Sequence, residues 1–239
     1  MKNIFILLIV FGLFLATIGS LRNQSTSSDP LNTKEERGSL MWYVKKAKAK
    51  GQTEITIPAS IVDYGGSSPS TTMAKVLSLY DCVIATPIDQ VTTPYSSDSI
   101  VTWFKLKTME VVSNTSNPEF SESEEDGGSI PKQLYPIAED EFVIAQYGGT
   151  LVIDRVKLTK TPEYPPFQPN KQYLLFIRRH SSGKAEIVGG PIGAFSIDEN
   201  ANLIPFVNAR HPLVTSIRES YNNSLYNVRN AIKLNQIQN

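Results

Sequence analysis

The segment from Gly148 to Ile197 consists of short apolar runs separated by turn residues. Its central run, Gln172–Ile177, has the length of a buried strand and is too short for a typical helix. The flanking runs are Gly148–Leu158, Ala185–Gly190 and Gly193–Ile197. Runs of this length and spacing favour strands that pair through hairpins. We therefore predict that this segment is the closing half of a small β-barrel.

The chain ahead of this segment supplies more candidate strands. Val83–Val91 is one, and Pro87 within it predicts an edge position or a bulge. Ile100–Val112 alternates imperfectly between apolar and polar residues, as in a long curved strand that changes face. Glu54–Pro58 is a further short strand. We predict an α+β fold with an antiparallel barrel of five or six strands over about residues 82–198.

Helical spacing occurs on both sides of these strands. Residues 34–50 have apolar positions three and four apart and end in a lysine-rich turn. A short helix is expected to end at Tyr80. A last helix, from about 212 to 234, is predicted to bury one face against the barrel, with docking to a partner as the alternative. Its apolar stripe is Leu213, Ile217, Tyr221, Leu225, Val228 and Ile232.

The first residues have the pattern of an export signal. Lys2 precedes an almost wholly apolar run over residues 4–18, which is short for a membrane span. We predict that residues 1–20 are a signal peptide or an uncleaved anchor that tethers the protein to the membrane. Residues 21–37 follow as a polar linker, and 38–239 as a single domain. The expected location is periplasmic or extracellular, with anchoring to the inner membrane as one option.

Composition narrows the functional classes. The 239 residues carry 23 basic and 23 acidic side chains, so no net basic charge favours nucleic acid as a partner. The single cysteine, Cys82, cannot form an internal disulfide and is expected to be a buried apolar residue. Only two histidines, His180 and His211, are present, and no metal-ligand or cofactor motif occurs. We predict no cofactor and no metal site.

Two loops are candidate interaction segments. The insertion over 113–141 is acidic but lacks the spaced oxygen ligands of a calcium loop, and weak cation binding stays open beside a solvated loop. The second loop contains four prolines and two aromatic residues, Tyr164 and Phe167. These rings either pack over the barrel end or present a binding surface. With Tyr147, they are the candidate binding residues.

Motifs with catalytic spacing are few. The run Ser181–Lys184 matches S-x-x-K, but it contains a glycine and lies between two expected strands, so a hairpin turn explains it. Glu139, Asp140 and Glu141 form an acidic run in a loop, which is more often solvated than catalytic. His180 and His211 are candidate general bases only if the fold brings a nucleophile to them. We therefore predict no catalytic residue.

The order of several short runs is similar to a known group of proteins. The runs are Val83-Ile84-Ala85, Thr102–Leu106, Gly148-Gly149-Thr150, Pro166-Phe167, Lys171–Phe176 and Gly193-Ala194-Phe195. Over about residues 40–215, this order resembles a family of uncharacterised exported bacterial proteins, which implies no activity. The middle of the chain also looks like the netrin-like barrel of tissue inhibitors of metalloproteinases. That resemblance implies an OB-like barrel only, because the amino-terminal cysteine and the disulfides of those inhibitors are absent.

Three functional hypotheses follow. The first is a non-catalytic exported module that binds a protein or another component of the cell envelope through loops at the barrel end. The second is a small hydrolase whose site is assembled from distant residues around His180 or His211. The third is a structural subunit that docks through its last helix. Absence of a catalytic signature favours the first and leaves the question of an enzyme open.

Overall fold

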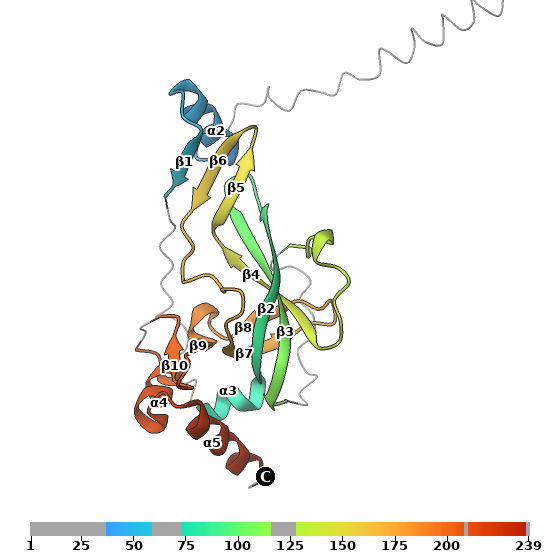
Figure 1. Ribbon diagram of the computed structural model, residues 1–239, viewed down its shortest axis with the longest axis vertical. Helices are drawn as coiled ribbons and strands as arrows, with labels where there is room; N and C mark the ends of the chain where they lie inside the picture. Colours follow the sequence, from blue (N-terminus) through green and yellow to red (C-terminus); the bar gives the residue numbers. More distant parts are fainter. Residues whose placement is uncertain (1–36, 59–72, 116–127, 208–209, 238–239) are drawn as a thin grey trace, which may run out of the picture. The chain divides into compact units, whose positions relative to one another are not determined.

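The computed structural model describes residues 37–58, 73–115, 128–207 and 210–237 (Figure 1). The expected export segment, residues 1–20, and nearly all of the expected linker lie outside the described residues. Most of the acidic run in the 113–141 insertion also lies outside them, because residues 116–127 are not described. Residues 38–239 form one compact unit by their contacts.

The larger sheet has seven strands and is antiparallel throughout. Its order is β10-β9-β7-β2-β3-β4, with β8 pairing beside β9 on the same side of β7. The strands are β2 (Asp81–Pro94), β3 (Ile100–Ser113), β4 (Glu141–Tyr147), β7 (Tyr173–Arg179), β8 (Ala185–Ile187), β9 (Ala194–Ile197) and β10 (Leu203–Pro205). The strands expected in Ile100–Val112 and Gln172–Ile177 are therefore confirmed.

A second sheet contains three strands in the order β1-β6-β5. The hairpin of β5 (Gly149–Ile153) and β6 (Val156–Lys160) is antiparallel, whereas β1 (Glu54–Ile57) pairs with β6 in parallel. Helix α2 (Leu40–Ala49) packs on this sheet and shares a small core with it. The described residues thus have an α+β fold with mostly antiparallel sheets and four α-helices.

Strand pairing does not close the larger sheet into the expected OB-like barrel. The sheet ends at β10 on one side and at β4 on the other. Between β4 and β8 there is one isolated bridge, in which the Val143 amide donates to the Gly183 carbonyl over 2.9 Å. The two strands therefore approach each other without forming a ladder.

Strand β7 lies at the centre of the sheet and is buried on both faces. Leu174 and Phe176 join one core cluster with helices α3 (Met73–Leu79), α4 (Pro212–Tyr221) and α5 (Leu225–Ile237). Tyr173, Leu175 and Ile177 point to the opposite face and join a second core cluster with β3 and β4. Because both faces are covered, residues 173–177 of β7 form a continuous apolar run with no polar alternation.

Strands β2 and β3 form a long irregular hairpin. Their register shifts at three places, and one shift follows Pro87 directly. A bulge removes the need for a ladder hydrogen bond at proline, which has no amide hydrogen. The sequence predicts an edge position or a bulge at Pro87, and the structure has the bulge.

Helix α2 begins later than expected. Gly38 has a φ of +102°, and the Ser39 hydroxyl accepts the amide hydrogen of Trp42 over 3.2 Å. A serine in this role marks the start of a helix because it satisfies an otherwise unpaired amide. Leu40 and Val44 then become the buried face of α2.

The single helix expected over 212–234 is wrong. Two helices, α4 and α5, replace it, and Asn222 and Asn223 separate them with φ values of +52° and +53°. Asparagine tolerates this left-handed conformation better than most residues, so the pair ends α4 and turns the chain. The apolar stripe continues through the turn: Leu213, Ile217, Leu225, Val228 and Ile232 are all buried. This burial removes the proposed docking surface for a partner.

Candidate functional site

The seam between β4 and β8 is the candidate site. We use this name for the space bounded by β4, β8 and the residues that line the cavity between them. The bridge at Val143 holds one end of the seam. In the described part of the chain, no strand pairs with this side of β4 beyond that bridge.

The open edge of β4 carries backbone hydrogen-bonding groups. The Val143 amide points away from β3, because it donates to Gly183. Backbone groups of a strand alternate between its two edges, so the amide and carbonyl of Ala145 point to the same side. An unpaired strand edge of this kind is a template for a further strand.

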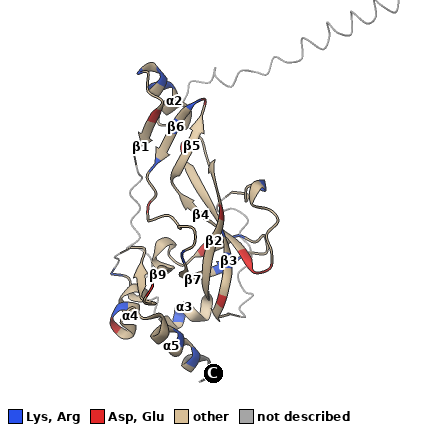
Figure 2. Ribbon diagram, in the orientation of Figure 1, with Lys and Arg blue, Asp and Glu red and all other residues tan. Residues whose placement is uncertain are grey.

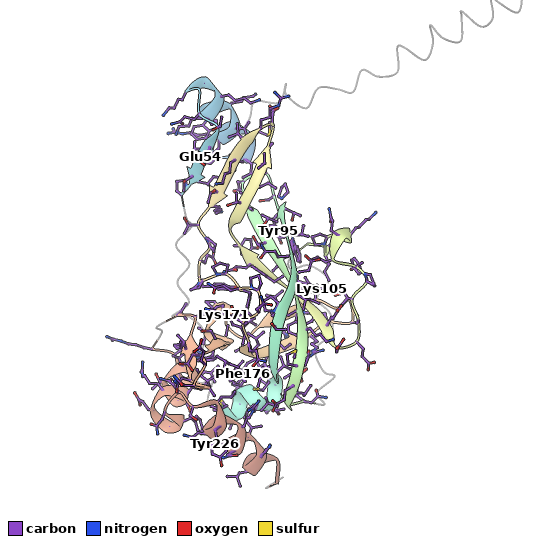
Figure 3. The ribbon with its side chains drawn as sticks, in the orientation of Figure 1. Glu54, Tyr95, Lys105, Lys171, Phe176 and Tyr226 are labelled. Atoms are coloured by element: carbon purple, nitrogen blue, oxygen red, sulfur yellow. The ribbon has the colours of Figure 1, made fainter. Side chains whose placement is uncertain are left out.

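A cavity of about 340 Å³ lies along this edge. Three tyrosines line it: Tyr95, Tyr147 and Tyr164. Tyr95, which directly follows β2 and is labelled in Figure 3, packs edge-to-face against Tyr147 with ring centroids 5.5 Å apart. The remaining lining is mostly aliphatic and includes Val101, Ile144, Ala145 and Ile187, with Lys184 and Glu186 as the charged members.

A buried glutamine fixes the loop that carries Tyr164. The Gln146 side-chain amide donates to the Tyr164 carbonyl over 2.6 Å, and Gln146 itself is almost fully buried. Burial raises the pKa of the Tyr164 phenol, with a smaller contribution from Glu163, so the ring stays neutral. The wall of the cavity formed by this loop is therefore anchored to β4.

The structure separates the three aromatic residues selected from the sequence. Tyr147 is 43% exposed, whereas Tyr164 and Phe167 are buried at 8% and 2% exposure. Of the two alternatives for Tyr164 and Phe167, packing holds: their rings pack with Phe206 in an aromatic cluster that also includes Tyr173, so they do not present a binding surface. Tyr147 and Tyr164 nevertheless line the same cavity.

Sequence reasoning missed Tyr95 and Ala145. Tyr95 lies in the turn after β2, and no periodicity distinguishes it from other turn residues. Ala145 matters through its backbone, and which edge of β4 stays open depends on pairings between distant strands. No local signal in the sequence specifies either position.

A second cavity, of about 470 Å³, contains His180. Ser181 and Ser182 line it with Glu139 and Glu141. The His180 Nε2 atom lies 3.4 Å from the Glu186 carboxylate, and the Ser182 hydroxyl accepts the Lys184 amide hydrogen over 3.4 Å. The predicted hairpin turn from Ser181 to Lys184 is confirmed by the pairing of β7 with β8.

His211 has a structural role at the start of α4. Its Nδ1 atom accepts the amide hydrogen of Leu213 over 3.2 Å, and the side chain is buried. Burial lowers the pKa of His211, which favours the neutral form that can accept this hydrogen bond. This capping interaction explains the presence of a buried histidine at the start of α4.

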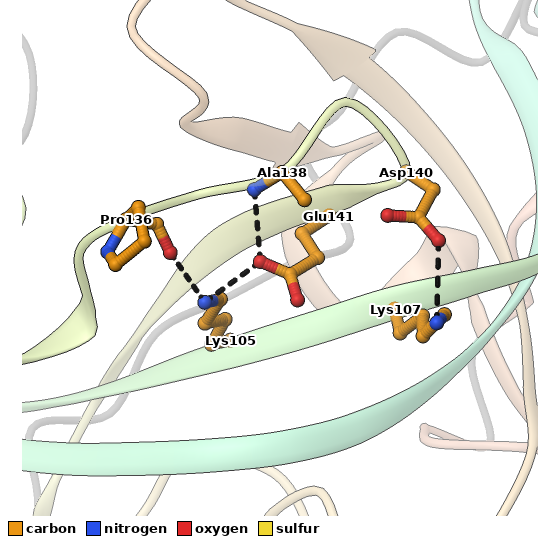
Figure 4. A network of polar contacts seen from close by, with 6 residues as sticks. All are labelled: Lys105, Lys107, Pro136, Ala138, Asp140 and Glu141. Carbon is orange, nitrogen blue, oxygen red and sulfur yellow. Dashed lines mark hydrogen bonds and ion pairs between the residues drawn. The ribbon is translucent and has the colours of Figure 1, made fainter.

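Two residues of the acidic run at 139–141, Asp140 and Glu141, are paired with lysines (Figure 4). Glu141 accepts the Ala138 amide hydrogen over 2.9 Å and lies 2.7 Å from Lys105. The hydrogen bond from Ala138 and the nearby Lys105 lower the pKa of Glu141. Asp140 pairs with Lys107 at 3.4 Å. These contacts hold the end of the insertion to β3. Because Asp140 and Glu141 are both paired with lysines, they do not form a catalytic acid and base.

Other reactive groups add no site. Cys82 is fully buried, and burial raises the pKa of its thiol, with smaller contributions from Glu110 and Asp81, so it stays protonated. Across the described residues, no group of three or more histidine, cysteine, aspartate or glutamate side chains is placed to hold a metal ion. Among the helices whose residues are described, none has the length and apolar character needed to cross a bilayer.

Comparisons with known proteins returned no match among protein-family models, curated proteins or solved structures.

Proposed function

We propose that this protein is an exported, non-catalytic binding module of the cell envelope, and that the seam receives an extended segment of a partner protein. The open edge of β4 at Ala145, next to an aromatic cavity, is the observation that carries the proposal. In strand addition, backbone hydrogen bonds supply affinity and pockets beside the edge select side chains. The seam combines both features within a few residues.

The same proposal includes an incomplete OB-like barrel. Residues of the second core cluster come from six strands and include Val83, Phe104, Phe142, Leu175 and Ile187, as expected for the inside of a curled sheet. The bridge at Val143 would be the beginning of closure. If β4 and β8 are held together in solution, the Val143 amide should exchange its hydrogen far more slowly than the Ala145 amide. Equal exchange rates, measured by NMR, would count against this arrangement.

A random-sequence peptide library displayed on phage provides the test of binding. We expect wild-type protein to enrich peptides that bind in extended form. Ala145→Pro removes the amide hydrogen on the open edge without removing a hydrogen bond to β3, and proline is tolerated at strand edges, so this variant should fold but lose the enriched peptides. Affinity is measured by calorimetry and folding by thermal denaturation.

Two tyrosine variants, one inside the cavity and one outside it, control for nonspecific binding to exposed aromatic rings. Tyr147→Ala removes a half-exposed ring from the cavity, whereas Tyr226→Ala removes a 69% exposed ring on α5, outside the cavity. Only the first should weaken binding, by roughly tenfold or more for loss of one packed ring. A library that yields no binder, or binders that tolerate Ala145→Pro, would refute uptake of a strand in the seam.

A second candidate function is a small hydrolase at the His180 cavity. The observation that favours it is the presence of two serines and two glutamates beside His180 in one cavity. A panel of chromogenic esters and peptides should then reveal turnover that His180→Ala abolishes. Turnover that survives this substitution, or no turnover with any substrate, would remove the candidate.

A further inference from the structure

The outward face of α2 carries a tryptophan between lysines. Leu40, Val44 and Ala47 are the buried face of this helix. At 100° per residue, Trp42 lies about opposite these positions, with Lys45 and Lys46 on either side of it. Trp42 does not belong to the core cluster beneath α2, although its neighbours Met41 and Tyr43 pack against that cluster.

Trp42 instead packs with residues of its own helix. The Lys46 ammonium group lies 4.7 Å from the centre of the indole ring, and the Tyr43 ring contacts it edge-to-face at 4.9 Å. A large aromatic ring turned away from the core is unexpected for a helix that only covers a sheet. Tryptophan with flanking lysines is typical of surfaces at the boundary between water and lipid.

Basic residues outnumber acidic ones around this helix (Figure 2). Helix α2 and its final turn contain no acidic residue. The adjacent β5–β6 turn adds Arg155, and its Asp154 is already paired with Lys48. The basic residues on α2 and its final turn are Lys45, Lys46, Lys48 and Lys50.

From this arrangement we propose that the outward face of α2 binds the surface of an anionic phospholipid membrane. The lysines contact lipid phosphates, and the Trp42 ring enters the interfacial region. Charge complementarity favours an anionic surface, and the half-buried indole ring on the outward face favours lipid over a purely polar polyanion. The proposal does not depend on the seam.

Fluorescence quenching of Trp42 tests this proposal with the full-length chain. The protein is mixed with vesicles of phosphatidylcholine alone or with added phosphatidylglycerol, each carrying a brominated lipid as quencher. We expect quenching only with the anionic vesicles, and its loss at high salt. Trp103 is 2% exposed and should contribute a constant background, which Trp42→Phe measures directly.

Charge variants distinguish binding through the outward face of α2 from attraction by the net charge of the protein. Replacing Lys45, Lys46 and Lys50 by glutamine should weaken vesicle binding about a hundredfold, since each interfacial lysine contributes roughly fivefold. Replacing three exposed lysines elsewhere, Lys132, Lys171 and Lys233, makes the same change in net charge and should leave the quenching intact. Equal quenching by both vesicle types, or equal effects of the two triple variants, would overturn the proposal. Salt-dependent self-association in place of quenching would also overturn it.

Discussion

At the scale of single residues, Gly149 controls how the chain passes from β4 to β5. Its φ is +127°, and a Cβ placed there would lie 2.2 Å from the Thr102 hydroxyl oxygen. That hydroxyl already donates to the Gly148 carbonyl over 2.8 Å. Gly149→Ala should therefore lower the free energy of unfolding by about 3 kcal/mol, through backbone strain and the displaced threonine.

Urea denaturation measures this loss, and a second glycine isolates its cause. Gly38 also has a positive φ, of +102°, but a Cβ there meets nothing within 4 Å. Gly38→Ala should cost only the backbone strain, about 1–2 kcal/mol. Equal losses for the two variants would show that contact with Thr102 is unimportant.

A second prediction at this scale concerns pH. Because burial lowers the pKa of His211 in the folded protein, the unfolded chain takes up its proton first as pH falls. Stability should decrease as pH drops through the ordinary value of 6.5 towards the lower folded value. His211→Asn keeps a side-chain acceptor at the helix start but cannot titrate, so its stability should be flatter in this range.

Denaturation midpoints between neutral and mildly acidic pH provide the measurement. The carboxyl groups whose pKa values are lowered, such as Asp98 and Asp198, contribute at more acidic pH. An identical slope in wild type and His211→Asn would assign the pH dependence to another group.

At the scale of elements, the turn between α4 and α5 depends on two asparagines in left-handed conformation. The Leu203 amide donates to the Asn223 carbonyl over 2.6 Å, which joins this turn to the start of β10. Replacing Asn222 and Asn223 by alanine should cost roughly 2 kcal/mol, whereas the double glycine variant should be nearly neutral. Urea denaturation gives the losses and circular dichroism the helix content. A stable alanine variant with increased helicity would mean that one continuous helix is tolerated.

The same element shows where sequence-based prediction succeeds and fails. Strands β2, β3, β7, β8 and β9 and helix α3 follow from apolar runs and spacing, because local pattern and burial agree there. The C-terminal stripe was misread because its apolar spacing of three and four continues across Asn222, although the backbone turns. Burial of Tyr164 and Phe167 depends on Phe206, which comes from a distant part of the chain.

At the scale of the whole molecule, Cys82 is a probe of the complete sheet. It lies in β2 between β3 and β7 and is fully buried. A thiol reagent can therefore reach it only when the central strands separate. The free energy of opening measured by labelling, and its dependence on urea, should equal those of global unfolding. Labelling through a smaller opening, with a weak dependence on urea, would show that the edge of the sheet separates on its own.

The candidate site likewise depends on the whole molecule, because its residues come from strands that are far apart in the sequence. Tyr95, Ala145 and Glu186 come from the end of β2, from β4 and from β8, and the cavity exists because these segments approach without pairing fully. The sequence predicts β2 and β8 but does not single out β4, and it contains no signal for where a ladder stops. Of the three aromatic residues predicted to bind, Tyr147 is therefore the one that the structure leaves at the surface.

The parallel pairing of β1 with β6 has a consequence for the order of synthesis. Ile57 pairs with Lys160, which is 103 positions further along the chain. The first strand of the described structure thus has no partner until well over half of the protein has been made. Such late, long-range contacts delay folding. The export that we propose requires a chain that is still unfolded when it threads through a secretion channel, and this topology would prolong the unfolded state.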